Sequence, residues 1–327
     1  MDVAVLALGN WGTALANHLA VKGLKVIGWS SEQSIVDGIN QERTHPHYLR
    51  DVRIHEGVSA TTDLGQALSC SKLVMAFPSS ALKELAPRMK LESGTLVVSA
   101  LKGLEPETLL TPLQYAAQHL GETVELSVLS GPSFATDVIH GRPSGLVAAS
   151  QREEVARKTA ELFSSPSMKV YISTDPIGVE LGGIAKNVIA IAAGVCDGLS
   201  MGDSARAGLI TRGLAEMMRL ATAMGAEART LSGLSGLGDL VMTATCDTSR
   251  NRTVGLRLGR GERLSDILQN LGSVAEGVRT ADLILEHASR HKVDMPITTH
   301  VRRLLAGELE LKDAPAALLS RPTKREF

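Results

Sequence analysis

Short runs of apolar residues, many of them β-branched, alternate with helix-length segments through the first half of the chain. These runs cover residues 3–8, 24–29, 73–77, 95–101 and 126–130, with weaker ones at 145–149 and 168–172. Between the first two, residues 12–22 have helical spacing, with Leu15 and Leu19 four positions apart and Gly23 placed to end the helix. Strands that are apolar throughout and alternate with helices predict a mostly parallel sheet covered on both faces. We therefore predict a doubly wound, Rossmann-like α/β domain over residues 1–175.

Strand-like runs disappear in the second half. Long helical segments replace them, for example 178–196, 205–225 and 280–290. Residues 177–199 are apolar enough to resemble a membrane span, with only Glu180, Lys186 and Asp197 charged. However, a lysine at mid-span is costly in lipid, and no basic residues flank the segment. The sequence predicts a buried core helix here, no membrane span, and an all-α C-terminal domain over residues 176–327.

Composition excludes several classes of protein. The 327 residues carry 34 Lys and Arg against 35 Asp and Glu, a net charge of −1, and only 3% are aromatic. Proteins that bind nucleic acids are normally basic, or stack bases on aromatic side chains, so this class is excluded. The three cysteines, Cys70, Cys196 and Cys246, are isolated, which argues against a disulfide framework and favours a reducing cytoplasm. No signal peptide is expected, since Met1 and Asp2 lead directly into the first apolar run.

The first strand is followed by a glycine-containing turn and a helix, an arrangement that can bind the pyrophosphate of a dinucleotide. Gly9 would let the backbone approach the anion, Gly12 would allow close helix–strand packing, and the helix N-terminus would supply amide donors. Ala7 stands where the first glycine of this motif is expected. The position of the turn, near the N-terminus between a strand and a helix, favours a dinucleotide over a glycine turn without a ligand.

The end of the second strand should contact the adenosine ribose. An acidic residue there favours NAD, and an arginine favours NADP. Glu32 lies a little beyond this strand end, and no arginine is adjacent. The sequence therefore does not decide between NAD and NADP.

Other strand ends would bring small, polar and cationic residues to the same edge of the sheet, where open parallel sheets bind ligands. Lys102 follows one apolar strand, and Gly131 and Ser133 follow the next. Lys102 is a candidate ligand-binding cation, although a lysine at a strand end can also simply extend to water.

Lys186 is a second candidate cation, because residues 181–190 surround it with apolar neighbours. Loss of hydration should lower the pKa of its ammonium group towards neutrality, which would make it a competent proton donor and acceptor. The alternative is a structural ion pair with Glu180 or Asp197. Glu180 is off the i, i+3 and i, i+4 spacing of a direct helix pair, so we favour a functional lysine.

A third group of candidates lies in the second domain. Residues 232–239, which end in Asp239, are rich in glycine. Ser249, Arg250 and Asn251 would place a hydroxyl, a guanidinium and a carboxamide side by side. These donors suit a phosphomonoester, whereas a single arginine of this run could also be a solvated surface charge.

No metal site is expected. His45, His47 and His55 occur without clustered carboxylates or cysteines and are interpreted as loop histidines.

These segments resemble the bacterial type of NAD(P)-dependent glycerol-3-phosphate dehydrogenase. The resemblance rests on eight stretches that follow the family order over essentially the whole chain: GNWGTALA (9–16), LKGLE (101–105), SGPSFA (130–135), ELGGIAKNVIA (180–190), TRGLAE (211–216), GLGDL (236–240), SRNR (249–252) and VAEG (274–277). It implies a cytoplasmic homodimer that uses NAD(H) or NADP(H) to interconvert dihydroxyacetone phosphate and sn-glycerol 3-phosphate for glycerophospholipid synthesis. Ser31 stands where relatives often carry arginine or histidine near the adenosine phosphate, so a strong NADP preference is not implied.

The same resemblance implies the residues of the site. Besides the glycine turn, those that would contact the cofactor are Asn10, Trp11, Ser31, Lys102, Ala135, Arg250, Val274 and Glu276. Those that would contact the substrate are Lys102, Gly131, Ser133, Lys186, Asp239, Ser249, Arg250 and Asn251. Lys186 would transfer the proton, Lys102 would hold and polarise the substrate, and Asp239 would orient the lysines or a substrate hydroxyl.

Two alternatives share the dinucleotide-binding fold. A dehydrogenase of another small hydroxy acid would keep the helix lysine but would not need the phosphate-binding residues. A non-catalytic sensor of the dinucleotide redox state would not need Lys102 together with Lys186.

Overall fold

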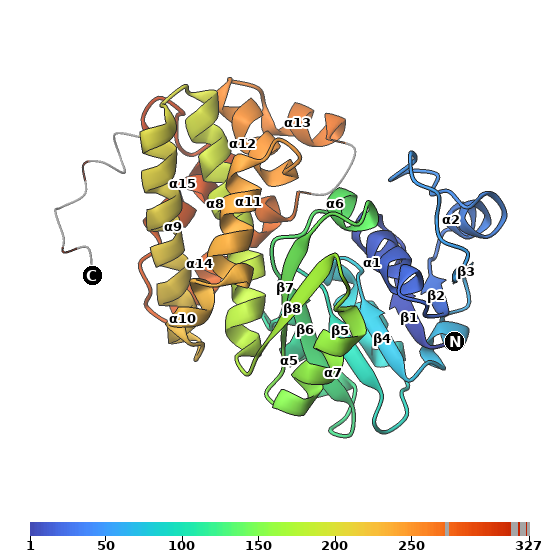
Figure 1. The fold of residues 1–327 in the computed structure, drawn as a ribbon. Helices are drawn as coiled ribbons and strands as arrows, with labels where there is room; N and C mark the ends of the chain where they lie inside the picture. The colour runs from blue at the N-terminus through green and yellow to red at the C-terminus, as the bar shows by residue number, and fades with distance from the viewer. Residues whose placement is uncertain (272–274, 315–319, 321–324, 326–327) are drawn as a thin grey trace. The chain divides into compact units, whose positions relative to one another are not determined.

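The computed structural model of the chain describes residues 1–271, 275–314, 320 and 325 (Figure 1). The chain divides into two compact units, residues 1–180 and 181–327. All strands of the described residues lie in the first unit.

An eight-stranded sheet forms the first unit, in the order β3-β2-β1-β4-β5-β6-β7-β8. The strands are β1 (Val3–Leu6), β2 (Val26–Trp29), β3 (Val58–Thr61), β4 (Lys72–Met75), β5 (Leu96–Ser99), β6 (Glu125–Ser130), β7 (Ser144–Ala149) and β8 (Met168–Ser173). Neighbouring strands are parallel except β6 and β7. The order of the first six, 3-2-1-4-5-6, is that of the Rossmann fold.

Helices cover both faces of this sheet. Successive strand residues point to opposite faces, so Val3 and Val5 lie in one apolar cluster and Ala4 and Leu6 in the other. The first cluster includes residues of α1 (Asn10–Val21), α2 (Gln33–Asp37), α6 (Ala135–Ile139) and α7 (Glu153–Phe163), and the second those of α3 (Leu64–Leu68), α4 (Leu82–Leu85) and α5 (Pro112–His119). The predicted doubly wound α/β fold is confirmed.

All seven strands predicted from the sequence occur, with ends shifted by at most two residues. The edge strand β3 is the exception, because the sequence does not predict it. It has only four residues, and Ser59 and Thr61 alternate with the buried Val58 and Ala60, so it shows no continuous apolar run.

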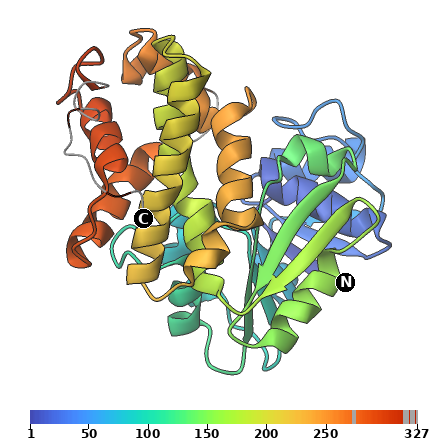
Figure 2. The same cartoon turned by 60° about the vertical axis from the view of Figure 1, so that its left-hand side comes forward.

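Helices form the second unit, and its described residues contain no strand (Figure 2). They are most of α8 (Pro176–Gly198), then α9 (Asp203–Ala223), α10 (Ala228–Leu231), α11 (Asp239–Thr245), α12 (Arg250–Gly259), α13 (Leu264–Asn270), α14 (Glu276–Arg290) and α15 (Pro296–Leu305). The predicted all-α second half is therefore confirmed for the described part of the chain.

Glycines let α8 and α12 cross at close range. A Cβ on Gly194 would lie 2.1 Å from the carbonyl oxygen of Arg252, and one on Gly255 would lie 1.9 Å from that of Ile191. Since no side chain fits at either position, this crossing requires glycine on both helices. It fixes the first turn of α12 beside α8.

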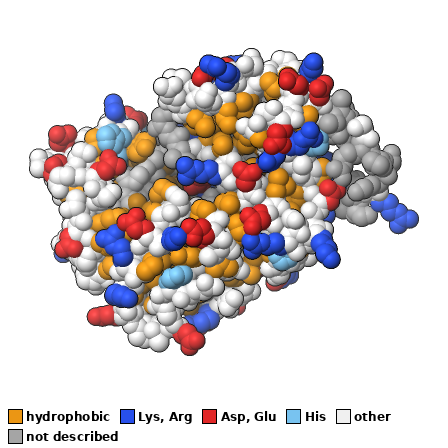
Figure 3. Space-filling view, turned by 180° about the vertical axis from the view of Figure 1, so that it is seen from behind, with side chains coloured by type: hydrophobic (Ala, Val, Ile, Leu, Met, Phe, Trp, Pro, Cys, Tyr) orange, Lys and Arg blue, Asp and Glu red, His pale blue; other side chains and the backbone are white. Residues whose placement is uncertain are grey.

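Among the described helices, α8 is the one long and apolar enough to cross a membrane. Its apolar window is completely buried within the protein, as expected of a core helix, so the prediction of a buried helix is confirmed. On the face of the molecule seen in Figure 3, acidic and basic side chains are interspersed.

Candidate active site

The turn after β1 has the close packing that the glycine motif predicts. A Cβ on Gly12 would lie 1.9 Å from the carbonyl oxygen of Ala7. Ala7 itself has a φ of +79°, in the left-handed region that glycine favours. The alanine therefore adopts the backbone conformation of the missing glycine, at a cost in strain.

The start of α1 has room and donors for an anion. Gly9 is the N-cap of α1 without a side-chain cap, and a Cβ built on it meets nothing within 4 Å. Its φ of −73° and ψ of −169° are open to any residue, so the surrounding protein does not require glycine here. The indole nitrogen of Trp11 is buried without a hydrogen-bond partner among the described residues, and a buried donor needs an acceptor. These features fit the phosphates of a dinucleotide.

Glu32 lies just beyond β2, where its backbone N–H donates to the hydroxyl of Ser30 (3.1 Å). Its carboxylate is 3.4 Å from the Nε2 atom of His47, and both side chains are about half exposed. Ser31 is exposed beside them. Sequence reasoning did not find His47 as a neighbour of this strand end, because the histidine comes from a separate loop.

Lys102, Gly131 and Ser133 lie together at the ends of β5 and β6. The Nζ atom of Lys102 donates to the carbonyl oxygen of Gly131 (3.4 Å), and the Ser133 hydroxyl donates to the same oxygen (3.1 Å). Gly131 has a φ of +142°, and a Cβ on it would lie 3.0 Å from the carbonyl oxygen of Gly145. Ala135 begins α6 shortly after this turn. The predicted gathering at the sheet edge is confirmed, while contact of these residues with a ligand stays a prediction.

In the second unit, two side chains of α11 hold a buried cation. Lys186 of α8 is 4% exposed and donates to the carboxylate of Asp239 and to the hydroxyl of Thr243 (2.8 Å). Asp239 is completely buried and also accepts from the Thr243 hydroxyl (3.3 Å). Burial disfavours the ammonium form and the carboxylate favours it, so the two effects oppose each other.

The alternative partners of Lys186 are engaged elsewhere. Glu180 accepts from the backbone N–H of Leu113 (2.8 Å), and burial raises the pKa of Glu180 to about 7. Asp197 pairs with Arg252. A structural pair with either acid, the alternative considered from the sequence, is therefore wrong.

The observed partner, Asp239, lies 53 positions along the chain from Lys186. Sequence reasoning did not find Thr243 at all. The one feature of the sequence that points to Thr243 is its position four residues after Asp239, which places both side chains on the same face of α11.

The predicted phosphate-binding residues begin α12. Ser249 is the N-cap, and its hydroxyl accepts from the backbone N–H of Arg252 (3.3 Å). Arg250 is the first residue of the helix and is exposed, and it forms no ion pair within the described part of the chain. A hydroxyl, a guanidinium and free amides at a helix start suit an anion.

Asn251 links α12 to two other helices. Its carboxamide donates to the Oδ1 atom of Asn187 (2.9 Å) and accepts from the backbone N–H of Gly277 (3.0 Å). It thereby holds the start of α14, whose first residue is Glu276. Val274 lies outside the described residues.

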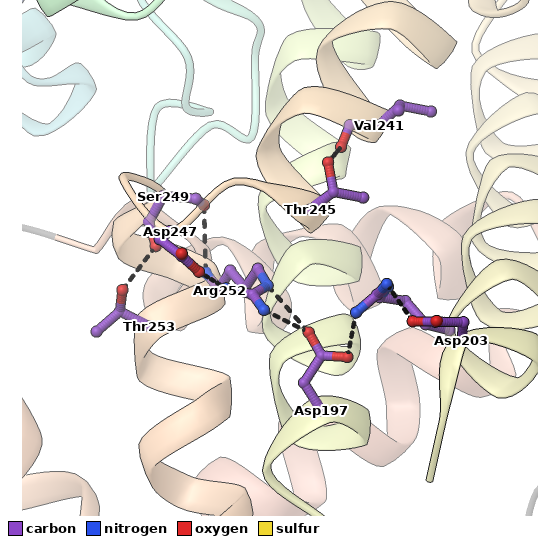
Figure 4. Close-up of polar contacts among 9 residues, drawn as sticks. Asp197, Asp203, Val241, Thr245, Asp247, Ser249, Arg252 and Thr253 are labelled. Carbon is purple, nitrogen blue, oxygen red and sulfur yellow. Dashed lines mark hydrogen bonds and ion pairs between the residues drawn. The ribbon is translucent and has the colours of Figure 1, made fainter. Parts of the chain in front are cut away.

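Arg252 belongs to an ion-pair network (Figure 4). Its Nε and Nη2 atoms donate to Asp197 (3.0 and 2.6 Å), and its Nη1 atom donates to Asp247 (2.6 Å). Asp197 also accepts from Arg206 (2.8 Å). Of the two arginines that flank Asn251, Arg250 is therefore the one available to an anionic ligand.

No three His, Cys, Asp or Glu side chains of the described residues are grouped so that they could hold a metal ion. Among the three histidines interpreted as loop residues, His45 is buried.

The Rossmann strand order, the glycine turn and the buried lysine define a dehydrogenase that uses a nicotinamide dinucleotide. Two family models match the chain: NAD-dependent glycerol-3-phosphate dehydrogenase N-terminus over residues 2–156, and the C-terminus of the same enzyme over residues 175–316. The chain belongs to the NAD-dependent glycerol-3-phosphate dehydrogenase family, as the sequence motifs predict.

Full-length relatives agree with this assignment. Glycerol-3-phosphate dehydrogenase (NAD(P)+) of Nitratidesulfovibrio vulgaris strain Hildenborough is 45% identical over 332 aligned positions, which cover 100% of both chains. The enzyme of the same name from Stenotrophomonas maltophilia strain K279a is 44% identical over 99% of this chain and 96% of its own. The crystal structure of glycerol-3-phosphate dehydrogenase from Coxiella burnetii has a TM-score of 0.93 at 39% identity, covering 98% of this chain and 99% of that one.

Proposed function

We propose that the protein catalyses the reversible reduction of dihydroxyacetone phosphate to sn-glycerol 3-phosphate with NADH or NADPH. The observation that carries this proposal is the buried cluster of Lys186, Asp239 and Thr243, a proton-transfer group shielded from water. The names of the full-length relatives support the choice of substrate.

We assign cofactor binding to residues 1–175 and substrate binding to residues 176–327. In the first domain, the cofactor would contact Gly9, Asn10, Trp11, Gly12, Ser31, Lys102 and Ala135, and in the second Arg250, Val274 and Glu276. The uncapped start of α1 and the buried indole N–H of Trp11 support this assignment for the phosphates.

When bound, the reduced nicotinamide supplies the hydride that is transferred to C2 of the substrate. Lys186 donates a proton to the ketone oxygen and takes it back from the hydroxyl in the reverse direction. The Asp239 carboxylate favours the ammonium form, so that the proton stays on Lys186 until the oxygen becomes basic during hydride transfer. The ammonium group of Lys102, which also donates to Gly131, would hold and polarise the substrate.

The residues at the start of α12 would bind the phosphate group of the substrate. The Arg250 guanidinium can grip two phosphate oxygens, and the Ser249 hydroxyl can donate to a third while it accepts from the helix backbone. Asn251 fixes the position of this turn through Asn187 and Gly277, and Gly131 and Ser133 would contact the rest of the substrate. A substrate without a phosphate would leave Arg250 with its cofactor contact alone and Ser249 without an anion to bind, which disfavours another small hydroxy acid.

We further propose a cytoplasmic homodimer that does not bind nucleic acid and whose product enters glycerophospholipid synthesis. The near-neutral net charge and the isolated cysteines support the location and the absence of a nucleic-acid partner. Light scattering of the purified protein would test the dimer.

One assay tests the proposed activity. NADH oxidation, followed by absorbance, should require dihydroxyacetone phosphate, and an unphosphorylated 2-keto acid should not replace it. Turnover with the keto acid alone would favour the other dehydrogenase. NADH binding without turnover of any substrate would favour the redox sensor.

A further inference from the structure

We propose that His45 positions the dinucleotide-binding turn, and so sets cofactor affinity, through a hydrogen bond to the carbonyl oxygen of Leu8. His45 is a positioning residue in this proposal, because it acts on the turn through Leu8. The proposal rests on the proposed function, since it takes the turn at residues 7–12 as the cofactor site.

His45 is 1% exposed, although it belongs to the loop between η1 (Gly38–Glu42) and β3. The loop has a defined shape. The backbone N–H of Ile54 donates to the carbonyl oxygen of Arg43 (2.7 Å) and closes it, and Arg43 and Leu49 take left-handed φ values of +58° and +52°. A loop of this kind can hold a side chain in one place.

Both ring nitrogens of His45 are used. Nδ1 accepts from the backbone N–H groups of His47 and Tyr48 (3.1 Å each), so it carries no hydrogen. The hydrogen of the neutral ring is therefore on Nε2, which donates to the carbonyl oxygen of Leu8 (2.7 Å). Burial lowers the pKa of His45, which favours this neutral form. The ring thus connects its own loop to the turn.

The Leu8 carbonyl lies inside the turn that precedes α1. The Thr13 hydroxyl of α1 donates to it as well (3.2 Å), so one donor comes from the helix and the other from the distant loop. Ala7, the preceding residue, is held at a φ of +79°. A strained backbone persists only where its surroundings hold it, and His45 supplies such a restraint from outside the turn.

The same loop reaches the second cofactor region. His47, two residues after His45, lies 3.4 Å from the Glu32 carboxylate beyond β2. The loop therefore contacts both strand ends at which the phosphates and the adenosine ribose of a dinucleotide would lie. We expect it to act on cofactor binding rather than on the substrate.

Two variants and a matched control test the proposal. His45→Ala removes every contact of the ring. His45→Gln keeps an N–H donor at about the same distance from the backbone as Nε2 of the histidine. His55→Ala is the control, because His55 is an exposed histidine of the same segment whose Nδ1 accepts from Gly57 (3.1 Å). NADH dissociation constants would be measured by fluorescence titration, with melting temperatures and KM for dihydroxyacetone phosphate alongside.

We expect His45→Ala to weaken NADH binding about tenfold, the scale of one lost buried hydrogen bond, with KM for dihydroxyacetone phosphate changed less than about twofold. His45→Gln should stay within about threefold of the wild type, and His55→Ala should bind NADH normally.

The proposal is overturned if His45→Ala binds NADH like the wild type, if His55→Ala loses as much, or if His45→Gln is as weak as His45→Ala. Should His45→Ala not fold, His45→Gln decides: retained binding supports the proposal, and a tenfold loss at an unchanged melting temperature overturns it. Wild-type protein that binds no NADH would refute the proposed function instead.

Discussion

Replacing Lys186 by methionine would perturb both stability and catalysis. The substitution keeps the length of the side chain, removes its charge and leaves the completely buried Asp239 carboxylate without its cation. A buried charge that loses its partner costs about 3–5 kcal/mol of unfolding free energy. Loss of a general acid lowers kcat by about 10²–10⁴. We therefore expect Lys186→Met to be inactive and unstable, and inactivity alone would not show a catalytic role.

The double variant Lys186→Met/Asp239→Asn separates the two effects. It removes both charges, and exchange of a buried ion pair for neutral side chains is often nearly neutral. We expect its unfolding free energy to recover to within about 2 kcal/mol of the wild type. Its kcat should stay lower by about 10² or more, because no proton donor returns. NADH affinity should change little in either variant.

Urea unfolding followed by circular dichroism gives the stabilities, and NADH oxidation at saturating dihydroxyacetone phosphate gives kcat. A stable double variant with more than about a tenth of the wild-type kcat would remove Lys186 from proton transfer. A single variant as stable as the wild type would show that the Asp239 charge does not depend on Lys186.

Four further outcomes follow from the structure. Ala7→Gly should raise the unfolding free energy by up to about 1 kcal/mol, because relief of left-handed strain, about 1–2 kcal/mol, exceeds the added chain entropy; a less stable variant in urea would contradict this. Arg250→Ala should cost about 2–4 kcal/mol in kcat/KM for dihydroxyacetone phosphate, and Arg250→Lys should recover part of this loss. Arg250→Ala should change kcat/KM for unphosphorylated dihydroxyacetone little, and the control variant Arg260→Ala should act on dihydroxyacetone phosphate like the wild type. The KM for the cofactor would be measured in each variant. Burial raises the pKa of Glu216 to about 7 from 4.5, so the stability it contributes is present below pH 4.5 and lost as pH rises through 7; Glu216→Gln should flatten this fall between pH 5 and pH 8 in unfolding experiments. With Ser31 in place of a cation, kcat/KM should be similar for both cofactors or mildly favour NADH, and an NADPH preference of about a hundredfold would require a 2′-phosphate site elsewhere.

Most of the sheet could be predicted because of how it is buried. Strands covered on both faces are nearly continuous apolar runs. β1 is apolar at every position, and β4 and β5 each have one polar residue, at an end of the strand. β3 could not be found in this way, because an edge strand with one half-exposed face needs only two buried residues.

Chemistry within one short segment could also be predicted, and contacts between distant segments could not. The tightest contact of Gly12 is with the carbonyl oxygen of Ala7, only five positions away. The pairs Lys186–Asp239 and His45–Leu8 join residues 53 and 37 positions apart, and nothing local marks them as partners. For this reason the sequence predicts only a loop histidine at position 45, whereas the structure buries its ring against the turn.

Arg250 and Arg252 show what additional information would be needed. They are two positions apart, so they point about 200° from one another around α12, and one must face solvent when the other faces α8. The side that α8 covers is set by glycines, since Gly194 and Gly255 mark where the two backbones touch. Asp197 lies three residues after Gly194, and Arg252 lies three residues before Gly255, which places both charges one turn from the crossing, where they pair. The pattern to look for is therefore a glycine on each of two helices, with an acidic residue three positions from one glycine and a basic residue three positions from the other. Here it assigns Arg252 to the fold and leaves Arg250 for a ligand.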